Sequence, residues 1–242
     1  MLTSRQAMPV ALLTGQVIAM LSIIPLVMFG NWWQYLITFI MYQAIVTLGI
    51  SMGYHRYLSH RAFKCPKWFE YLMVFFGHIM MVGSAVLWVA THREHHAFTD
   101  TDKDPHSPKH KGWFYAHFLQ VLTNPRKKFM IDILRDPFYR NQHKYYWHTI
   151  ALWSLFLVII DPFSLVYAWL APAGISKLLG SLVFSYSHRN GQPNTDAWVA
   201  LVSGGEGYHE PHHKNARQIR WGKYDLGGVI IEKCFHQKDF IA

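Results

Sequence analysis

Long uncharged apolar stretches alternate along this chain with segments rich in His, Lys and Arg. No Asp, Glu, Lys or Arg lies between Arg5 and Arg56, whereas a soluble domain needs charges over its whole surface. A helix of about 20 apolar residues crosses the hydrocarbon core of a bilayer. We therefore predict four membrane-spanning helices, at about residues 10–29, 32–53, 145–160 and 163–184.

The distribution of positive charge predicts how these spans are oriented. Very short turns at residues 30–31 and 161–162 join the spans in pairs and contain no Lys or Arg. Residues 55–144 contain fourteen Lys and Arg, and the tail after residue 188 contains seven. Because Lys and Arg collect on the cytoplasmic side of membrane proteins, we expect the long loop, the tail and both termini to be cytoplasmic.

Length and charge add little that the spans do not already explain. The 242 residues suit one domain, 1–242. The formal net charge of +9 fits a cytoplasmic excess of Lys and Arg in a membrane protein, and no nucleic-acid motif accompanies it, so we expect no nucleic-acid partner. Cys65 and Cys234 have neither metal-type spacing nor a disulfide pattern.

Three histidine clusters stand near the ends of apolar stretches, and a lone histidine follows the last span. The clusters are His55 with His60, His92 with His95 and His96, and His209 with His212 and His213; the lone residue is His188. Polar residues at membrane depth are costly, so such an array at span ends indicates function. Eight imidazoles and a ninth suit two metal ions, but imidazole binds Zn, Cu, Fe and Ni alike.

Spacing predicts how each cluster is arranged. Residues at i, i+3 and i+4 share one face of a helix, as in the second cluster; the third has the same spacing, although we expect Pro211 to interrupt a regular helix. His55 and His60 are about 140° apart on an ideal α-helix, so we expect the helix after Gly53 to end between them. The other histidines are expected to be ordinary polar residues: His78, His106, His110, His117, His143, His148 and His236.

Residues 71–90 form a further uncharged stretch that is long enough to span a membrane. A crossing there would place the first two histidine clusters on opposite sides. We therefore expect one helix that packs on the cytoplasmic face or dips into it.

These clusters, in this order and on this span pattern, resemble the membrane fatty acyl desaturases, most closely the delta-9 group. The resemblance covers about residues 53–225. It also includes these motifs: Arg61-Ala-Phe63, Trp88, Asp102-Lys-Asp104-Pro-His106, Lys111-Gly-Trp113 and Glu206-Gly-Tyr-His209. It implies an all-α fold with four transmembrane helices and a cytoplasmic helical cap.

The resemblance also implies a metal centre of two iron ions (Fe2+) held by nine histidines. These would be His55, His60, His92, His95, His96, His188, His209, His212 and His213. The chain departs from the family at Phe184, where the family has an Asn four residues before the lone histidine. We expect this departure to leave one metal in more open or more apolar surroundings.

The implied activity is the introduction of a cis double bond into a saturated acyl chain, linked to CoA or to a membrane lipid. Its implied partners are O2 and a separate electron donor, a ferredoxin or a cytochrome b5-like protein. Lys64, Lys67 and residues 126–128 are candidates for binding head-group phosphates, or they form a solvated face near anionic lipid. Lys177, within the last span, is expected to snorkel, face a polar core or touch substrate.

Two alternatives stay open. A di-iron hydroxylase on the same scaffold would share the clusters, although the His-x4-His spacing of the first cluster favours a desaturase. A non-catalytic haem or metal carrier would place paired histidines within its spans rather than at their ends.

Overall fold

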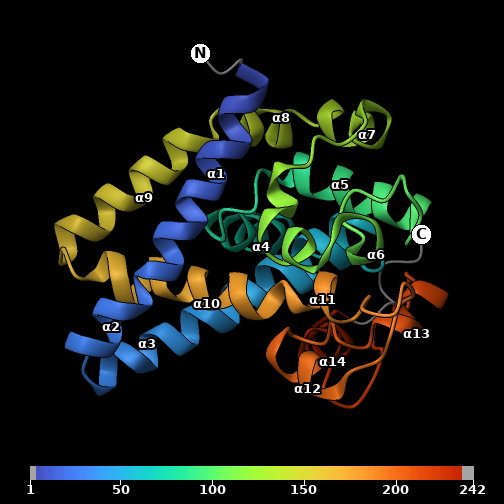
Figure 1. Ribbon diagram of the computed structural model, residues 1–242. Coiled ribbons are helices and arrows are strands. Elements are labelled where there is room, and N and C mark those ends of the chain that lie inside the picture. The colour runs from blue at the N-terminus through green and yellow to red at the C-terminus, as the bar shows by residue number, and fades with distance from the viewer. Residues whose placement is uncertain (1–3, 236–242) are drawn as a thin grey trace.

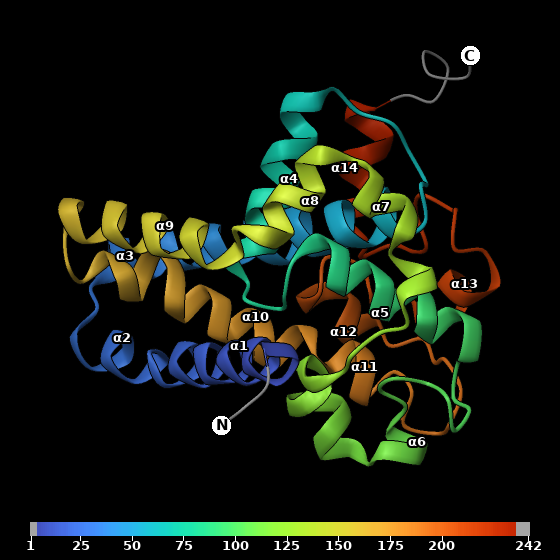
Figure 2. The same cartoon turned by 90° about the horizontal axis from the view of Figure 1, so that it is seen from above.

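The computed structural model describes residues 4–235, and its regular secondary structure in that range is helical (Figure 1). Long helices run side by side at one end of the molecule, and shorter helices gather at the other (Figure 2). The long-helix end contains α1 (Ser4–Leu21), α2 (Ile23–Phe29), α3 (Trp32–Gln43), α9 (Tyr146–Ile160), η5 (Val166–Leu170) and α10 (Ala171–Gly180).

Three helical stretches in the described range are long and apolar enough to cross a membrane: Ala7–Phe29, Trp32–Ser59 and Val166–Ser185. They lie close to three of the four predicted spans. The predicted span at 145–160 corresponds to α9, an apolar helix of 15 residues that is shorter than the usual span length. Large apolar side chains such as Phe29, Phe39 and Ile159 are exposed on this end of the molecule, which is typical of a lipid-facing surface.

The second of these stretches continues beyond its predicted end at residue 53. After α3, the chain forms a π-helix, η1 (Ala44–Ser59), which contains His55 and leads directly to His60. The helix ends at Ser59, between these histidines as expected, but its last turns are π-helical rather than α-helical. The amide of His60 donates to the carbonyl of His55 at 3.1 Å, an i→i+5 bond, and this wider winding brings residues five apart toward one side.

The stretch 71–90 does not form the single helix that we expected. It lies in α4 (Lys67–Ile79) and α5 (Ala85–Phe98), which are separated by a turn in which Met81 and Gly83 have φ values of 60° and 97°. Helix α4 packs closely along η1: a Cβ on Gly49 would lie 2.4 Å from the backbone nitrogen of Gly77. Only glycine permits this backbone contact.

The remaining helices form the other end of the molecule, which we call the cap (Figure 2). Together with α4 and α5 they are α6 (Pro108–Lys111), η2 (Tyr115–Leu119), η3 (Gln120–Leu122), η4 (Lys127–Phe129), α7 (Ile131–Arg135), α8 (Pro137–Lys144), α11 (Leu182–Ser185), α12 (Ala197–Val202), α13 (His209–Lys214) and α14 (Leu226–Cys234). An apolar core joins the two ends, with Leu12, Ile45, Ile79, Tyr146 and Trp169 buried in it.

Candidate metal centre

Three elements that are distant in sequence bring the histidine clusters together. The π-helix η1 and its C-cap carry His55 and His60, α5 carries the second cluster, and α13 carries the third. The structure shows α13 as a helix of six residues, so the expectation that Pro211 interrupts it is wrong. Proline is tolerated there because it stands in the first turn, where its missing N–H has no helical partner.

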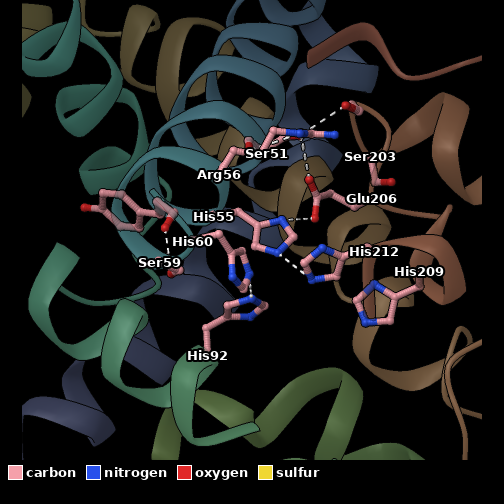
Figure 3. Close-up of polar contacts among 12 residues, drawn as sticks. Ser51, His55, Arg56, Ser59, His60, His92, Ser203, Glu206, His209 and His212 are labelled. Atoms are coloured by element: carbon pink, nitrogen blue, oxygen red, sulfur yellow. Dashed lines mark hydrogen bonds and ion pairs between the residues drawn. The ribbon is translucent and has the colours of Figure 1, made fainter. Parts of the chain in front are cut away.

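Five of the nine predicted histidines form one group, whose ligand atoms all lie within 4.8 Å of one another: His55, His60, His92, His96 and His212. Their Nε2 atoms point inward: the pairs His60–His92 and His55–His212 are 2.8 and 3.1 Å apart (Figure 3). The pair His96–His212 is 2.9 Å apart. The rings therefore surround a common point, and most pairs among them meet edge to face.

The other four predicted histidines form a second group within the same 4.8 Å limit: His95, His188, His209 and His213. The Nε2 atom of His213 lies 3.3 Å from that of His95 and 3.2 Å from that of His209. The Nε2 atom of His188 is buried and has no hydrogen-bond partner among the described residues. The structure thus collects all nine predicted residues in two adjacent groups.

Buried carboxylates hold the opposite ring nitrogen of three of these histidines. His95 Nδ1 lies 2.9 Å from Asp104 Oδ2, and His188 Nδ1 lies 2.7 Å from Asp100 Oδ2. His55 Nδ1 contacts a carboxylate oxygen of Glu206 (Figure 3). A carboxylate that accepts the Nδ1 proton leaves the Nε2 lone pair free, which is how metal-binding histidines are usually oriented.

Burial keeps four of the nine imidazoles neutral. It lowers the pKa values of His92, His95, His209 and His212 well below 6.5, because the charged form loses its hydration, and neighbouring histidines lower them further. Burial also raises the pKa of Asp104 to about 6 and that of Glu206 to about 7. Neutral imidazole is the form that binds metals.

The geometry fits an ion in each group. Metal–imidazole bonds are about 2.0–2.1 Å long for zinc, so adjacent nitrogens around a six-coordinate ion are about 2.9 Å apart. The observed separations of 2.8–3.3 Å match this spacing. Without an ion, several inward lone pairs would face each other with too few protons to pair them. Metal binding by these histidines stays a prediction that the arrangement favours.

Comparison with known proteins decides the family. The model of the fatty acid desaturase family matches residues 30–233. The chain belongs to the fatty acid desaturase family. It is 34% identical to delta-9 acyl-lipid desaturase 2 of Arabidopsis thaliana, over 83% of this chain and 71% of that protein. It is 33% identical to sn-1 stearoyl-lipid 9-desaturase of Anabaena variabilis, over 84% of this chain and 80% of that protein. An acyl-CoA 5-desaturase of Anemone leveillei is 30% identical, over 84% and 69%.

The predicted family and enzyme class are therefore confirmed: the protein is a fatty acyl desaturase, an oxidoreductase of a membrane family with a fatty acyl substrate. The histidine groups agree with the metal dependence typical of this family.

A buried ionic network behind the desaturase's first group was missed by the sequence reasoning. Arg56 donates to Asp225 through Nη2 at 2.8 and 2.9 Å and lies 3.1 Å from Glu206 Oε1. Ser51 donates to the same Glu206 oxygen at 2.6 Å (Figure 3). The position of Arg56 directly after His55 was the available signal, but its partners are 150 and 169 residues away.

Three carboxylates that hold histidines were also not assigned. Asp104 and Glu206 stood in quoted motifs without a role, and Asp100 was not singled out. Asp100 and Glu206 stand near one cluster in the sequence but hold a ring from another part of the chain, that of His188 and that of His55. Only the fold shows which ring each one contacts.

The six other histidines that the structure describes lie outside both groups, and His236 lies outside the described residues. Most have ordinary polar contacts: His78 with Tyr146 and Gln142, His110 with Asp100, His117 with Ser185, His143 with Ser84, and His148 with the ring of Tyr145. His106 is different, because it stacks on His95 at 4.5 Å and forms a small cluster with that residue and Asp104.

A cavity of about 490 Å3 runs along the desaturase's histidine groups. His92 and His209 are in its wall, and so is Phe184, whose ring lies 4.7 Å from that of His106. The rest of the lining is largely apolar, with side chains such as Leu12 and Val46. This volume is within the range of small-molecule sites, roughly 300–1,000 Å3.

Proposed function

We propose that this desaturase introduces a cis double bond at the delta-9 position of a saturated acyl chain, at a di-iron centre held by the nine histidines. The observation that carries the proposal is the meeting of two histidine groups at the wall of an apolar cavity. Relatives from a plant and a cyanobacterium, named for 9-desaturation of acyl lipids, support the position and a lipid-linked substrate.

The two histidine groups offer places for two metal ions, and membership of the fatty acid desaturase family supports iron as the metal. When bound, two irons would activate O2 as the oxidant. Overall, O2 accepts the two hydrogens removed from adjacent methylene groups, two electrons from a separate donor protein and two protons, and it leaves as two waters. The chain's own residues prepare this chemistry. The buried carboxylates of Asp100, Asp104 and Glu206 hold the Nδ1 protons, so the Nε2 atoms stay directed inward.

The cavity would bind and orient the substrate. Its apolar walls favour an acyl chain over water, which keeps bulk solvent away from the reacting carbons. Side chains of His92 and His209 stand in the wall, so a chain in the cavity passes beside both groups. A bound chain is then held close to the metal centre with little freedom of orientation.

For the membrane arrangement we propose four spans, with the cap and both termini in the cytoplasm. Support for the fourth span comes from α9, whose exposed Leu152, Leu155 and Ile159 face outward. At about 1.5 Å per residue, its 15 residues extend about 22 Å, so the bilayer would thin slightly or flanking aromatic residues would extend the span. Positive charge on one side supports the orientation.

Expression in a host that lacks its own desaturase tests the function. We expect monounsaturated fatty acids with the double bond at carbon 9, detected by mass spectrometry, from the wild type but not from His92→Ala or His209→Ala. Hydroxylated fatty acids in place of unsaturated ones would show the alternative hydroxylase activity. A metal-loaded protein that forms neither product would refute the proposal.

A further inference from the structure

A buried lysine next to the cavity has no role in the proposed metal centre. Lys177 lies in α10, within a stretch that is apolar enough to span a membrane, and only 1% of it is exposed. In the described part of the chain its ammonium group bonds only neutral oxygens, the carbonyl of His117 at 2.8 Å and Oε1 of Gln120 at 3.0 Å. A buried cation at membrane depth is costly and usually functional.

The lysine determines which way the Gln120 amide faces. An ammonium group can only donate, so the amide oxygen must face Lys177 and the amide nitrogen must face away from it. That nitrogen donates to Oγ of Ser181 at 3.3 Å, and its second N–H has no partner among the described residues. Gln120 and Ser181 both line the cavity. The cavity wall therefore presents an oriented N–H donor.

This donor suits the acyl carbonyl, which is the one polar group that an acyl chain brings into an apolar cavity. Gln120 begins the segment 120–127, whose exposed Asn124 and Lys127 mark where the cavity meets the surface. The same cavity is lined by His92 and His209 of the two metal groups. An ester or thioester carbonyl that leaves water needs a hydrogen-bond donor, because an unpaired polar group is costly to bury.

We propose that Gln120 donates a hydrogen bond from Nε2 to the acyl carbonyl of the substrate, and that Lys177 is a positioning residue that fixes the Gln120 amide. This contact sets how many methylene groups separate the carbonyl from the metal centre, and so determines where the double bond forms. The inference rests on the proposed desaturase function and names a residue that sets its regioselectivity.

Two substitutions at one position test the contact. Gln120→Glu keeps the shape of the side chain and its bond from Lys177, but a carboxylate has no N–H to donate. Gln120→Leu removes both functions. Gln16→Leu is the matched control, since Gln16 is also a buried glutamine of the cavity wall, but its amide donates to the carbonyl of Met81.

The readout is the position of the double bonds in the host's fatty acids, determined by mass spectrometry of dimethyl disulfide adducts. Since one neutral hydrogen bond changes an equilibrium by roughly tenfold, we expect both Gln120 variants to make about tenfold less product, with double bonds spread over neighbouring positions. The control is expected to keep the wild-type position. Labelled stearate shows whether the double bond appears first in acyl-CoA or in glycerolipid, which separates thioester from ester.

The outcomes separate this inference from the proposed function. If the wild type forms no unsaturated product, the proposed function fails. If the wild type is active and both Gln120 variants keep its double-bond position, the carbonyl contact is refuted. Complete inactivity of both variants at wild-type metal content also counts against it, because loss of one hydrogen bond does not abolish turnover. If the double bond changes position in Gln16→Leu alone, the contact belongs to Gln16, and the assignment to Gln120 is refuted.

Discussion

Removal of the Asp100 carboxylate tests whether the second histidine group holds a metal. Asp100 accepts the Nδ1 proton of His188 at 2.7 Å, and its other oxygen accepts from Ser107 at 2.8 Å. Without this acceptor the His188 ring can rotate, or carry its proton on the nitrogen that faces the group. Asp100 has a φ of 56°, so Gly is the substitution that removes the carboxylate without adding backbone strain.

Loss of such a carboxylate typically weakens metal binding by about 10–100-fold, or about 1.4–2.7 kcal/mol. We expect Asp100→Gly to lose one of two metal ions at a chelator concentration that leaves both in the wild type. The first histidine group does not contact Asp100, so the ion in that group should stay bound. Metal content after dialysis against increasing chelator, measured by inductively coupled plasma mass spectrometry, gives both affinities.

The matched control is Asp100→Asn, which tolerates the same backbone conformation and keeps an oxygen that can accept the His188 proton. Its metal content should stay much closer to that of the wild type. If Asp100→Gly retains both ions as tightly as the wild type, the carboxylate does not orient a ligand, and the assignment of His188 is refuted.

Three further predictions address other parts of the molecule. Phe184→Asn should raise metal retention or activity, since it restores a polar side chain beside the second group; no change in either would show that this position has no ligand role. In intact cells with both native cysteines replaced, Asn31→Cys should react with an impermeant maleimide and Lys109→Cys only after permeabilisation; the reverse would overturn the topology. Burial raises the pKa of Glu70, but hydrogen bonds from two tyrosines and a lysine outweigh burial and lower the pKa below 4.5. The contribution of ionised Glu70 to the stability of the fold is therefore present above that pH and is lost as the pH falls further. Melting temperatures in detergent should then fall more between pH 5 and pH 3, roughly, in the wild type than in Glu70→Gln; equal falls would contradict this.

Local patterns predicted the helical class, and the resemblance of the histidine clusters to those of the desaturases predicted the family and the convergence of the histidines. Apolar runs show candidate spans, and the His-x-x-His-His spacing places side chains on one face of a helix. The winding of η1 was not predictable, since a π-helix and an α-helix have the same hydrophobic pattern over a short stretch. An ideal α-helix therefore placed His55 and His60 on different sides, and the observed i→i+5 bond corrects that.

Contacts between distant segments were beyond the sequence for a different reason. The partners of Arg56, Gln120 and His188 are 57 to 169 residues away from them, and no local rule specifies such pairs. The break at Met80–Ser84 was also missed, because hydropathy in that stretch is uniform and only one of its two residues with positive φ, Met81 and Gly83, is a glycine.

The close packing of α4 on η1 limits how this enzyme can admit its substrate. Where two backbones touch at Gly49 and Gly77, neither helix can slide or rotate without a steric clash. The second span and the part of the cap built on α4 therefore move as one rigid body, and the two histidines of η1 move with it. The cavity is also lined by α1 and by the segment 120–127, and a route between these two leaves the rigid α4–η1 contact intact. An acyl chain entering by that route would leave the metal ligands undisturbed in every turnover.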